Sequence, residues 1–464
     1  MIINLQTLRK IVINFIYPIF TRRRMLNRRN TFFVVLVMIL IVVTSLFVLY
    51  GNSFLEQKPE PEPSVSWQID LEHFISDIVY DDVRVFVIDV SNVICLNKTN
   101  GEEIWRKVGN SGGASKLLLY EDKLYAGTHG GAVTSFDKYT GEELLKFQAP
   151  VSTTWGGKSP PQDFFIEDGR LFVYQNGYAV FNATSGELFY DFGGYFIDLG
   201  NASAAASESS FIFMSGATRI NPNNGEILWG LQGSASDPAV ITQEKIILWN
   251  YNPAGGQELG TFILCVDTSG AILWSYDVSS PMYQPKVFNE LVLFGAYDGN
   301  FYALQTSNGS LAWKILVTNQ ANQTKIVGNN GRDLTPVVSS IQIETKKNTA
   351  VWSFAFIQNY WGGVIEYVGT VCGIDAVNGH LLWKIPIENN NTSISASNLL
   401  YPISQGLALL NDYAFLTVSS DFYIINAQTG NIFEEKNFEH FLLQPTASKD
   451  MVFLAEELHL TAYK

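Results

Sequence analysis

The side chains best suited to metal or thiol chemistry are few in this chain and lie far apart. Zinc sites use Cys and His ligands at short, paired spacings, and no two of the five histidines lie within four residues of each other. We therefore expect the histidines to be surface or loop residues, and we predict no metal ligand. The residues concerned are His73, His129, His380, His440 and His459, with Cys95, Cys265 and Cys372 as the three thiols.

Sequence patterns that position a nucleophile or cradle a phosphate are also missing. The chain has no Gly-rich phosphate loop, no Gly-x-Ser-x-Gly elbow and no His-Glu-x-x-His pair. Its nearest approach to a calcium loop, residues 221–225, lacks the distal acidic ligand. We therefore predict no catalytic residue and no bound cofactor, and a non-enzymatic role is favoured.

A short turn phrase recurs eight times and indicates which elements the chain forms. Each copy has a β-rich run, an Asn, Asp or Gln, a few small polar residues, a Gly, and an apolar stretch that usually contains Trp. Successive glycines lie 40, 45, 39, 45, 39, 70 and 51 residues apart, which is the period of a four-stranded blade. The copies are residues 97–101, 137–141, 182–186, 221–225, 267–270, 305–309, 375–379 and 426–430.

Such a repeat predicts an all-β protein, a β-propeller. Four short strands cannot bury both faces of a sheet, whereas sheets stacked around an axis cover one another. We expect about eight four-stranded blades, with seven to nine possible, and we interpret the recurrent Trp as a spacer between blades. Residues 65–71 look like a lone fourth strand, which predicts that the N-terminal strand completes the last blade and closes the ring.

The repeat frame also argues against a disulfide. Cys95 and Cys265 each lie two residues before the turn residue of well-separated blades, and Cys372 lies three residues before its own. The Cα atoms of Cys95 and Cys265 cannot approach within the ~7 Å that a bridge allows. We predict three buried thiols, with Cys372 facing the opposite side of its sheet.

Residues 297–304 and 307–313 resemble the pyrroloquinoline-quinone (PQQ)-like repeat of β-propellers, as do residues 125–133 and 137–141. The likeness covers residues 64–464. It implies either a quinone-dependent alcohol or sugar dehydrogenase or a non-catalytic scaffold such as the outer-membrane assembly lipoprotein with a similar propeller. One fold carries many functions, so the resemblance indicates the fold more strongly than the activity.

In the dehydrogenases, the resemblance implies PQQ, Ca²⁺ held by carboxylate and amide groups, a catalytic Asp and often a ring of adjacent cysteines. This chain has no adjacent cysteines. Trp155 and Trp361, each followed by two glycines, resemble the Trp-Gly segments near the quinone, but no acidic cluster accompanies them. We favour the alternative interpretation, in which each is an aromatic cap over a turn. PQQ and calcium therefore stay without supporting residues.

The 70-residue interval between Gly309 and Gly379 predicts one blade with extended strands and a long polar loop at residues 318–333. Long loops in compact domains are usually functional or disordered. Asn329 and Arg332 of this loop, together with Trp155 and Trp361, are therefore our candidate partner-binding residues.

Residues 31–50 are twenty uncharged residues, long enough to cross a membrane as a helix. Residues 1–30 carry seven basic and no acidic residues, and residues 51–63 form a Pro/Glu-rich linker. The positive-inside rule predicts a cytoplasmic basic arm, a signal-anchor helix and an extracytoplasmic propeller at residues 64–464, periplasmic or at the cell surface.

The net charge of the chain and its N-glycosylation sequons indicate which partners and modifications to expect. Outside the basic arm, 23 basic residues face 44 acidic ones, a formal charge of −21 that argues against nucleic acid. Asn-x-Ser/Thr sequons predict possible glycosylation if the propeller is exported. The sequons are at Asn97, Asn182, Asn201, Asn308, Asn322, Asn390 and Asn391.

Three functions are consistent with these features. The first is a membrane-anchored scaffold that binds protein or glycan partners outside the cytoplasm, favoured by the anchor and the missing catalytic set. The second is a PQQ-dependent dehydrogenase, suggested only by the repeat. The third is a ligand sensor, whose thirty-residue cytoplasmic arm would need a separate signalling partner.

Overall fold

The computed structural model describes most of residues 62–464. The described residues are 62–89, 92–108, 114–128, 132–148, 163–174, 178–192, 205–207, 211–214, 218–221, 224–231, 234–241, 245–252, 260–317, 326–327, 333–338, 342–344, 347–357, 367–389, 405–418, 420–438 and 442–464. The predicted basic arm, the apolar segment 31–50 and nearly all of the linker lie outside them. Among the described residues there is no helix long and apolar enough to cross a membrane.

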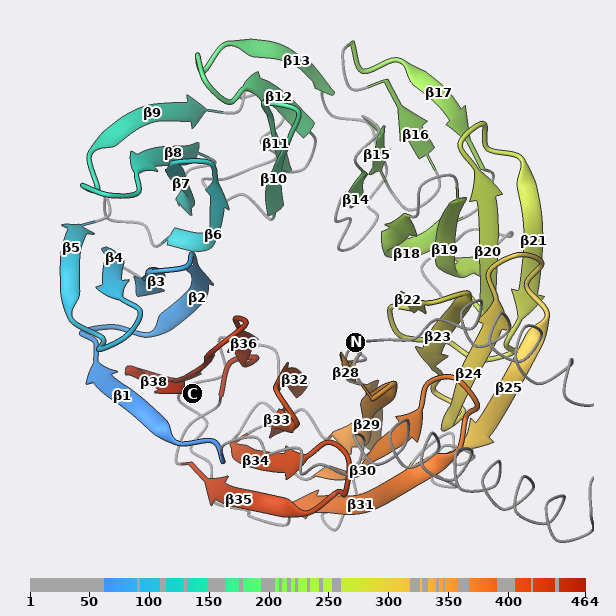
Figure 1. Ribbon diagram of the computed structural model, residues 1–464. Coiled ribbons are helices and arrows are strands. Elements are labelled where there is room, and N and C mark those ends of the chain that lie inside the picture. The colour runs from blue at the N-terminus through green and yellow to red at the C-terminus, as the bar shows by residue number, and fades with distance from the viewer. Residues whose placement is uncertain are drawn as a thin grey trace, which may run out of the picture. The chain divides into compact units, whose positions relative to one another are not determined.

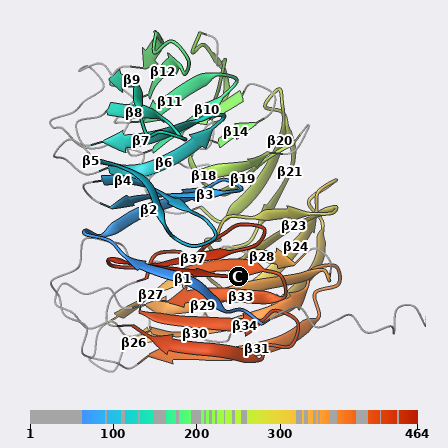
Figure 2. The same cartoon turned by 60° about the vertical axis from the view of Figure 1, so that its left-hand side comes forward.

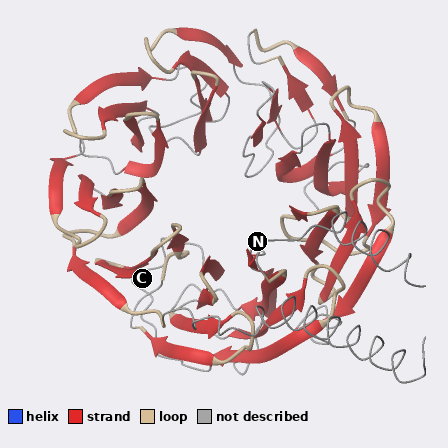
Figure 3. Cartoon of the chain, in the orientation of Figure 1, coloured by secondary structure: helices blue, strands red, loops and turns tan. Residues whose placement is uncertain are grey.

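In the described residues the strands form nine antiparallel sheets (Figure 3), which we number in chain order. Sheet 1 contains β2 (Ile75–Tyr80), β3 (Arg84–Asp89), β4 (Asn92–Asn97) and β5 (Glu103–Val108). Sheet 2 contains β6 (Ala114–Tyr120), β7 (Lys123–Thr128), β8 (Ala132–Asp137) and β9 (Glu143–Gln148). Sheet 3 contains β10 (Asp163–Glu167), β11 (Arg170–Tyr174), β12 (Tyr178–Asn182) and β13 (Leu188–Phe192).

The middle of the chain contributes three more four-stranded sheets. Sheet 4 contains β14 (Ala205–Ser207), β15 (Phe211–Met214), β16 (Thr218–Ile220) and β17 (Ile227–Gly230). Sheet 5 contains β18 (Ser234–Ile241), β19 (Lys245–Asn252), β20 (Phe262–Asp267) and β21 (Ile272–Asp277). Sheet 6 contains β22 (Lys286–Phe288), β23 (Leu291–Gly295), β24 (Asn300–Gln305) and β25 (Leu311–Leu316).

The last three sheets include one enlarged sheet and one built from both ends of the unit. Sheet 7 contains β26 (Ile326–Val327), β27 (Asp333–Val338), β28 (Gln342–Glu344), β29 (Thr349–Ile357), β30 (Tyr367–Asp375) and β31 (Leu381–Asn389). Sheet 8 contains β32 (Gln405–Leu410), β33 (Tyr413–Val418), β34 (Asp421–Asn426) and β35 (Ile432–Asn437). Sheet 9 contains β36 (Thr446–Ala447), β37 (Val452–Glu456), β38 (His459–Tyr463) and β1 (Val65–Asp70).

Within residues 63–464 these sheets follow one another around a common centre (Figure 1), and neighbouring sheets lie face to face (Figure 2). In the four-stranded sheets the first strand is innermost and the fourth is outermost, and in sheet 7 the outermost strand is β31. This arrangement is a β-propeller, as the repeat predicts. Nine sheets are formed in the described residues, at the upper end of the predicted range and one more than the favoured eight, because the composite sheet 9 adds to eight complete repeats.

The ring is closed by β1, as predicted. This strand pairs with β38, with Trp67 opposite Ala462 and Asp70 opposite His459. Backbone hydrogen bonds between Ser64 and Lys464 extend the pairing in both directions, at 3.2 and 3.0 Å. The pairing removes the free edge that β38 would otherwise present.

Turn chemistry explains the repeat locally, and residues 137–141 show it clearly. The Asp137 carboxylate accepts hydrogen bonds from the backbone N–H groups of Tyr139 (2.9 Å) and Thr140 (2.8 Å). The following Gly141 adopts φ +70°, which favours glycine. A β-bulge then begins the outermost strand in each of sheets 1–8, and such bulges discourage edge-to-edge pairing.

Core side chains fill the layers between neighbouring sheets. The middle strands β3 and β4 are buried along nearly their whole length, which reflects cover on both faces. Cys95, Cys265 and Cys372 are buried and free, as predicted, and burial raises the pKa of the Cys95 thiol to about 12. The thiols therefore behave as small apolar residues.

Candidate functional site

At one edge of the ring, which we call the turn edge, the turn before the outermost strand lies beside an earlier turn of the same sheet, as backbone hydrogen bonds show in sheets 1, 2, 3, 6, 7 and 8. In sheet 2, for example, the backbone N–H of Lys138 in the later turn donates to the carbonyl of Asp122 in the earlier one, at 3.2 Å.

A tryptophan lock holds six of the junctions between neighbouring sheets. The Trp of one sheet covers the turn glycine of the next, so closely that a Cβ on Gly379 would lie 2.5 Å from Trp313. The indole N–H of Trp313 also donates to the backbone carbonyl of Val377, at 3.0 Å. The Trp and Gly pairs are Trp67 and Gly101, Trp105 and Gly141, Trp229 and Gly270, Trp274 and Gly309, Trp313 and Gly379, and Trp383 and Gly430.

The locks confirm that the recurrent Trp packs between blades. The six indole N–H groups donate to backbone carbonyls of the next sheet at 2.8 to 3.1 Å. At the junction of sheets 2 and 3, Leu145 takes the place of Trp and lies 3.7 Å from a Cβ built on Gly186, an ordinary contact. These aromatic rings are therefore committed to the fold.

The junction between sheets 1 and 2, which we call junction 1/2, adds a clasp of charged residues to its lock. The guanidinium of Arg84 lies 4.5 Å from the ring centre of Tyr139 in the next sheet, and it donates to the Asp81 carboxylate at 3.2 Å. The Lys138 ammonium lies 3.8 Å from Asp81 and 3.3 Å from Asp122. Two cations and two carboxylates thus fill the space beside the lock.

Electrostatics within this clasp favour the charged forms. The Tyr139 hydroxyl donates to the Asp122 carboxylate at 2.7 Å. This hydrogen bond, followed by that from Lys138, holds the pKa of Asp122 below its ordinary value of 3.8. The same contact raises the pKa of Tyr139.

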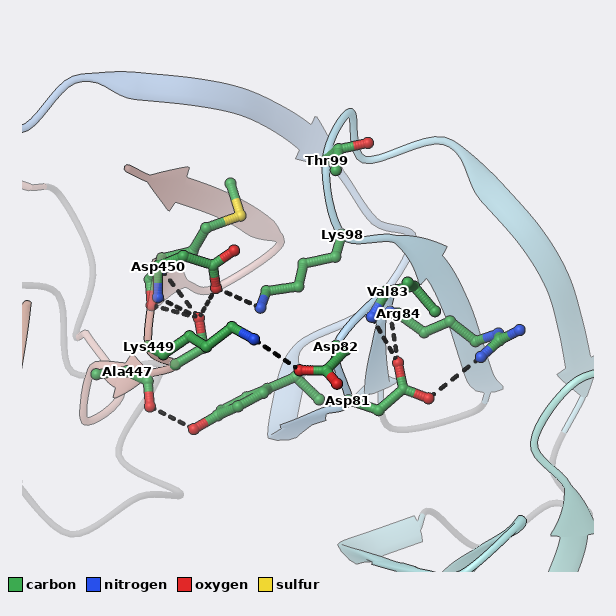
Figure 4. A network of polar contacts seen from close by, with 12 residues as sticks. Asp81, Asp82, Val83, Arg84, Lys98, Thr99, Ala447, Lys449 and Asp450 are labelled. Atoms are coloured by element: carbon green, nitrogen blue, oxygen red, sulfur yellow. Dashed lines mark hydrogen bonds and ion pairs between the residues drawn. The ribbon is translucent and has the colours of Figure 1, made fainter.

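A related network spans the closing junction between sheets 9 and 1, which we call junction 9/1 (Figure 4). The Lys98 ammonium donates to the Asp450 carboxylate at 2.5 Å, although Lys98 is only 2% exposed and Asp450 is 55% exposed. Lys449 donates to Asp82 at 3.2 Å across the same junction. The Tyr80 hydroxyl donates to the carbonyl of Ala447. Polar contacts therefore reinforce the point where the chain ends meet.

The junction between sheets 6 and 7, which we call junction 6/7, has the same lock but holds a groove of about 610 Å³. Its lining residues are Asn289, Glu290, Leu291, Gln305, Ala312, Trp313, Val377 and Asn378. The floor is apolar, and amides and one carboxylate stand at the rim. No basic residue lines it.

Two positions that carry cations in junction 1/2 carry apolar residues at this junction. Leu291 pairs with the turn residue Gln305, the position that Arg84 occupies opposite Asn97. Ala376 follows the turn residue of sheet 7 as Lys138 follows that of sheet 2. Both cations of the clasp are thus replaced by smaller apolar residues.

The partner-binding residues that we predicted from the sequence stay a prediction. Trp155, Trp361, Asn329 and Arg332 lie outside the described residues. The groove was missed because Trp313 was assigned to packing. The signal was present: Gln305 is the one copy of the turn phrase that does not begin with Asn or Asp.

Three of the predicted sequons can be located. Asn308 is exposed, whereas Asn97 and Asn182 are half-buried and accept hydrogen bonds from backbone N–H groups of their own turns at 2.9 and 2.8 Å. Glycosylation of these residues stays a prediction. The other four sequons, Asn201, Asn322, Asn390 and Asn391, lie outside the described residues.

Metal sites and perturbed acids were also sought in the described residues. None of the His, Cys, Asp and Glu side chains there form a group of three that could hold a metal ion. Burial raises the pKa of Asp77, whose carboxylate accepts hydrogen bonds from the backbone of Leu117 (2.7 Å) and Ile78 (2.8 Å) and so joins sheets 1 and 2. Burial, followed by the charge of Asp168, raises the pKa of Glu167 to about 7.

The fold and its locked junctions define a PQQ-like repeat β-propeller. The family model described as outer membrane protein assembly factor BamB matches residues 61–190 and 214–464. Since that is well over half of the chain, the protein belongs to this family.

Individual relatives are distant. The chain is 22% identical over 204 residues to the outer membrane protein assembly factor BamB of Yersinia pestis, a match that covers 42% of this chain and 45% of that protein. BamB from Moraxella catarrhalis has 12% identity, with coverage of 87% and 98% and a TM-score of 0.48. The quinohemoprotein alcohol dehydrogenase from Comamonas testosteroni has 13% identity, with coverage of 86% and 76% and a TM-score of 0.49.

Proposed function

We propose that this protein is a non-enzymatic scaffold, anchored in a membrane by residues 31–50, whose propeller binds protein partners outside the cytoplasm. The observation that carries the proposal is the family match across the ring, since the family description names an assembly factor. The open groove at junction 6/7 supports it, because it leaves polar and apolar groups accessible on a rigid edge.

The proposed topology keeps the propeller near the lipid. The linker of residues 51–63 leads into β1, which begins at Val65. Thirteen extended residues span at most about 45 Å. A partner held by the ring would therefore also lie close to the membrane surface.

Site-specific photo-crosslinking of the full chain in intact membranes tests the proposal. A crosslinking residue is placed at Val377 on the turn edge or, in a second variant, at Val108, which ends β5 and is 81% exposed. We expect a discrete protein adduct from at least one position, and glycan adducts or background alone at both would contradict the proposal. Non-irradiated samples of both variants are the control.

The dehydrogenase alternative is tested by a separate experiment. Full-length protein mixed with PQQ and Ca²⁺ should not reduce an electron-accepting dye when alcohols or sugars are added. Saturable PQQ uptake together with substrate-dependent dye reduction would overturn the scaffold assignment in favour of a quinoprotein enzyme.

A further inference from the structure

We propose that the groove at junction 6/7 binds a Lys or Arg side chain of a protein partner. This inference rests on the proposed function, because it takes the occupant to be part of a partner polypeptide. It adds the chemistry of recognition: a basic side chain enters where the clasp of junction 1/2 holds its own cations.

Other junctions show which side chains occupy the position of Leu291. In sheet 1, Arg84 reaches Tyr139 of the next sheet. In sheet 5, the Lys245 ammonium donates at 2.9 Å to the carbonyl of Thr306 in the next sheet. Both residues pair in register with the turn residue of their own sheet, as Leu291 does. A cation extending over the neighbouring turn is thus a recurrent solution, and sheet 6 does not supply it.

The groove offers suitable acceptors for such a cation. Within the described residues, the side chains of Asn289, Glu290 and Gln305 form no hydrogen bond or ion pair. In the other turns, for example at Asp137, the corresponding side chain caps the turn. Gln305 is one methylene longer than Asn, and it lines the groove instead.

Charge and surface favour a peptide segment over a free cation. The whole chain carries a formal charge of −14, so a basic segment is attracted over a distance. The stem of Lys or Arg matches the apolar floor at Leu291 and Trp313. Val377, which lines the groove and is 49% exposed, and Leu311, which precedes the lining residue Ala312 and is 44% exposed, offer contacts to apolar neighbours of the basic residue.

A peptide titration tests the proposal. The probe is a fluorescein-labelled Gly-Leu-Lys-Leu-Gly peptide with blocked ends, and its match carries norleucine in place of Lys. Anisotropy is measured against the full chain in detergent. Charge-assisted hydrogen bonds predict that the Lys peptide binds at least about tenfold more tightly than the norleucine peptide, and that 1 M salt weakens it.

Two variants locate the site. Glu290→Gln, at an exposed position, should weaken binding of the Lys peptide by about tenfold, and Leu291→Arg should abolish it by supplying the cation internally. Glu142→Gln, which removes an exposed carboxylate from a turn of sheet 2, is the matched control and should bind the Lys peptide as the parent does. The Glu290→Gln comparison does not depend on whether Leu291→Arg folds.

Three results would overturn the proposal. They are equal binding of the two peptides, unchanged binding by Glu290→Gln, and binding of N-acetyl-lysine amide as tight as that of the peptide, which would identify a free small cation. A dimer of the parent that Glu290→Gln dissociates would instead make the occupant a second copy. Failed crosslinking at both Val377 and Val108 counts against the scaffold function, whereas a failed titration counts against this groove.

Discussion

Junction 1/2 and junction 6/7 have the same backbone frame and opposite contents. In both, a Trp covers a turn glycine, Trp105 over Gly141 and Trp313 over Gly379. Junction 1/2 fills the adjoining space with charged side chains, while junction 6/7 leaves a groove. The difference shows that the lock sets the register between neighbouring sheets. The surrounding turn residues are therefore free to change, and a junction can hold a groove while the ring stays closed.

The largest expected effect concerns the part that the two junctions share. Gly141→Ala and Gly379→Ala should each destabilise the protein by about 3 kcal/mol. Alanine is strained at the positive φ of these glycines, and its Cβ would overlap the neighbouring Trp ring. Gly186→Ala meets only Leu145 at an ordinary distance and should cost about 1 kcal/mol. Denaturant unfolding of the purified full chain measures all three. Similar values for Gly186→Ala and Gly379→Ala would show that the lock is not what holds the junctions.

Junction 9/1 tests whether burial of Lys98 determines how much its ion pair with Asp450 contributes to stability. Asp450→Ala leaves the buried Lys98 ammonium without its carboxylate and should cost about 2–3 kcal/mol. Lys98→Met removes the buried charge, keeps the volume and should cost less than about 1 kcal/mol. Thermal unfolding of the two variants gives the order. Equal losses would mean that burial of Lys98 is unimportant.

Exchanging the side chains of the two junctions is expected to change the free energy of unfolding less. Replacing both clasp cations in the double variant Arg84→Leu, Lys138→Ala should cost about 1–2 kcal/mol, because exposed ion pairs and cation–π contacts contribute little each. Leu291→Arg should gain no more than about 1 kcal/mol. Unfolding in low and in 1 M salt checks this, and a loss that salt does not reduce would point to packing as the cause.

The smallest predicted effect is a pH dependence confined to junction 1/2. The Asp122 pKa is lowered in the folded protein, so its contribution is present above pH 3.8 and is lost as pH falls through the lowered value. Asp122→Asn should therefore be less stable than the parent at pH 7, and the difference should disappear as pH falls through the lowered pKa. Tyr139→Phe, which removes the main hydrogen bond, should shrink this difference. A gap between parent and Asp122→Asn that is constant with pH would contradict the assignment.

Much of the fold could be predicted because its causes are local. The four-stranded blade that the repeat predicts is formed in sheet 6 by β22 to β25, whose limits lie at turn residues. The recurrent Trp and the closing strand β1 also follow from the pattern. The number of sheets was harder to predict, because sheet 9 combines one strand from the N-terminal end of the propeller with three strands from its C-terminal end.

The groove resisted prediction for a different reason. Leu291 and Gln305 pair within sheet 6, but Val377 and Asn378 arrive from a turn some 70 residues further on. Their meeting depends on the register that the lock imposes between two sheets, and the 70-residue interval obscures that register in the sequence. Long polar segments attracted attention instead.

By itself the sequence determined the repeating strands, the glycine turns, the aromatic spacers and the closure by β1, because each depends on backbone conformation or on a pattern repeated at a fixed period. Only the tertiary structure decided which junctions are filled and which is open. That outcome depends on side chains from neighbouring sheets that meet across a junction, and no local pattern in the sequence reveals which of them meet.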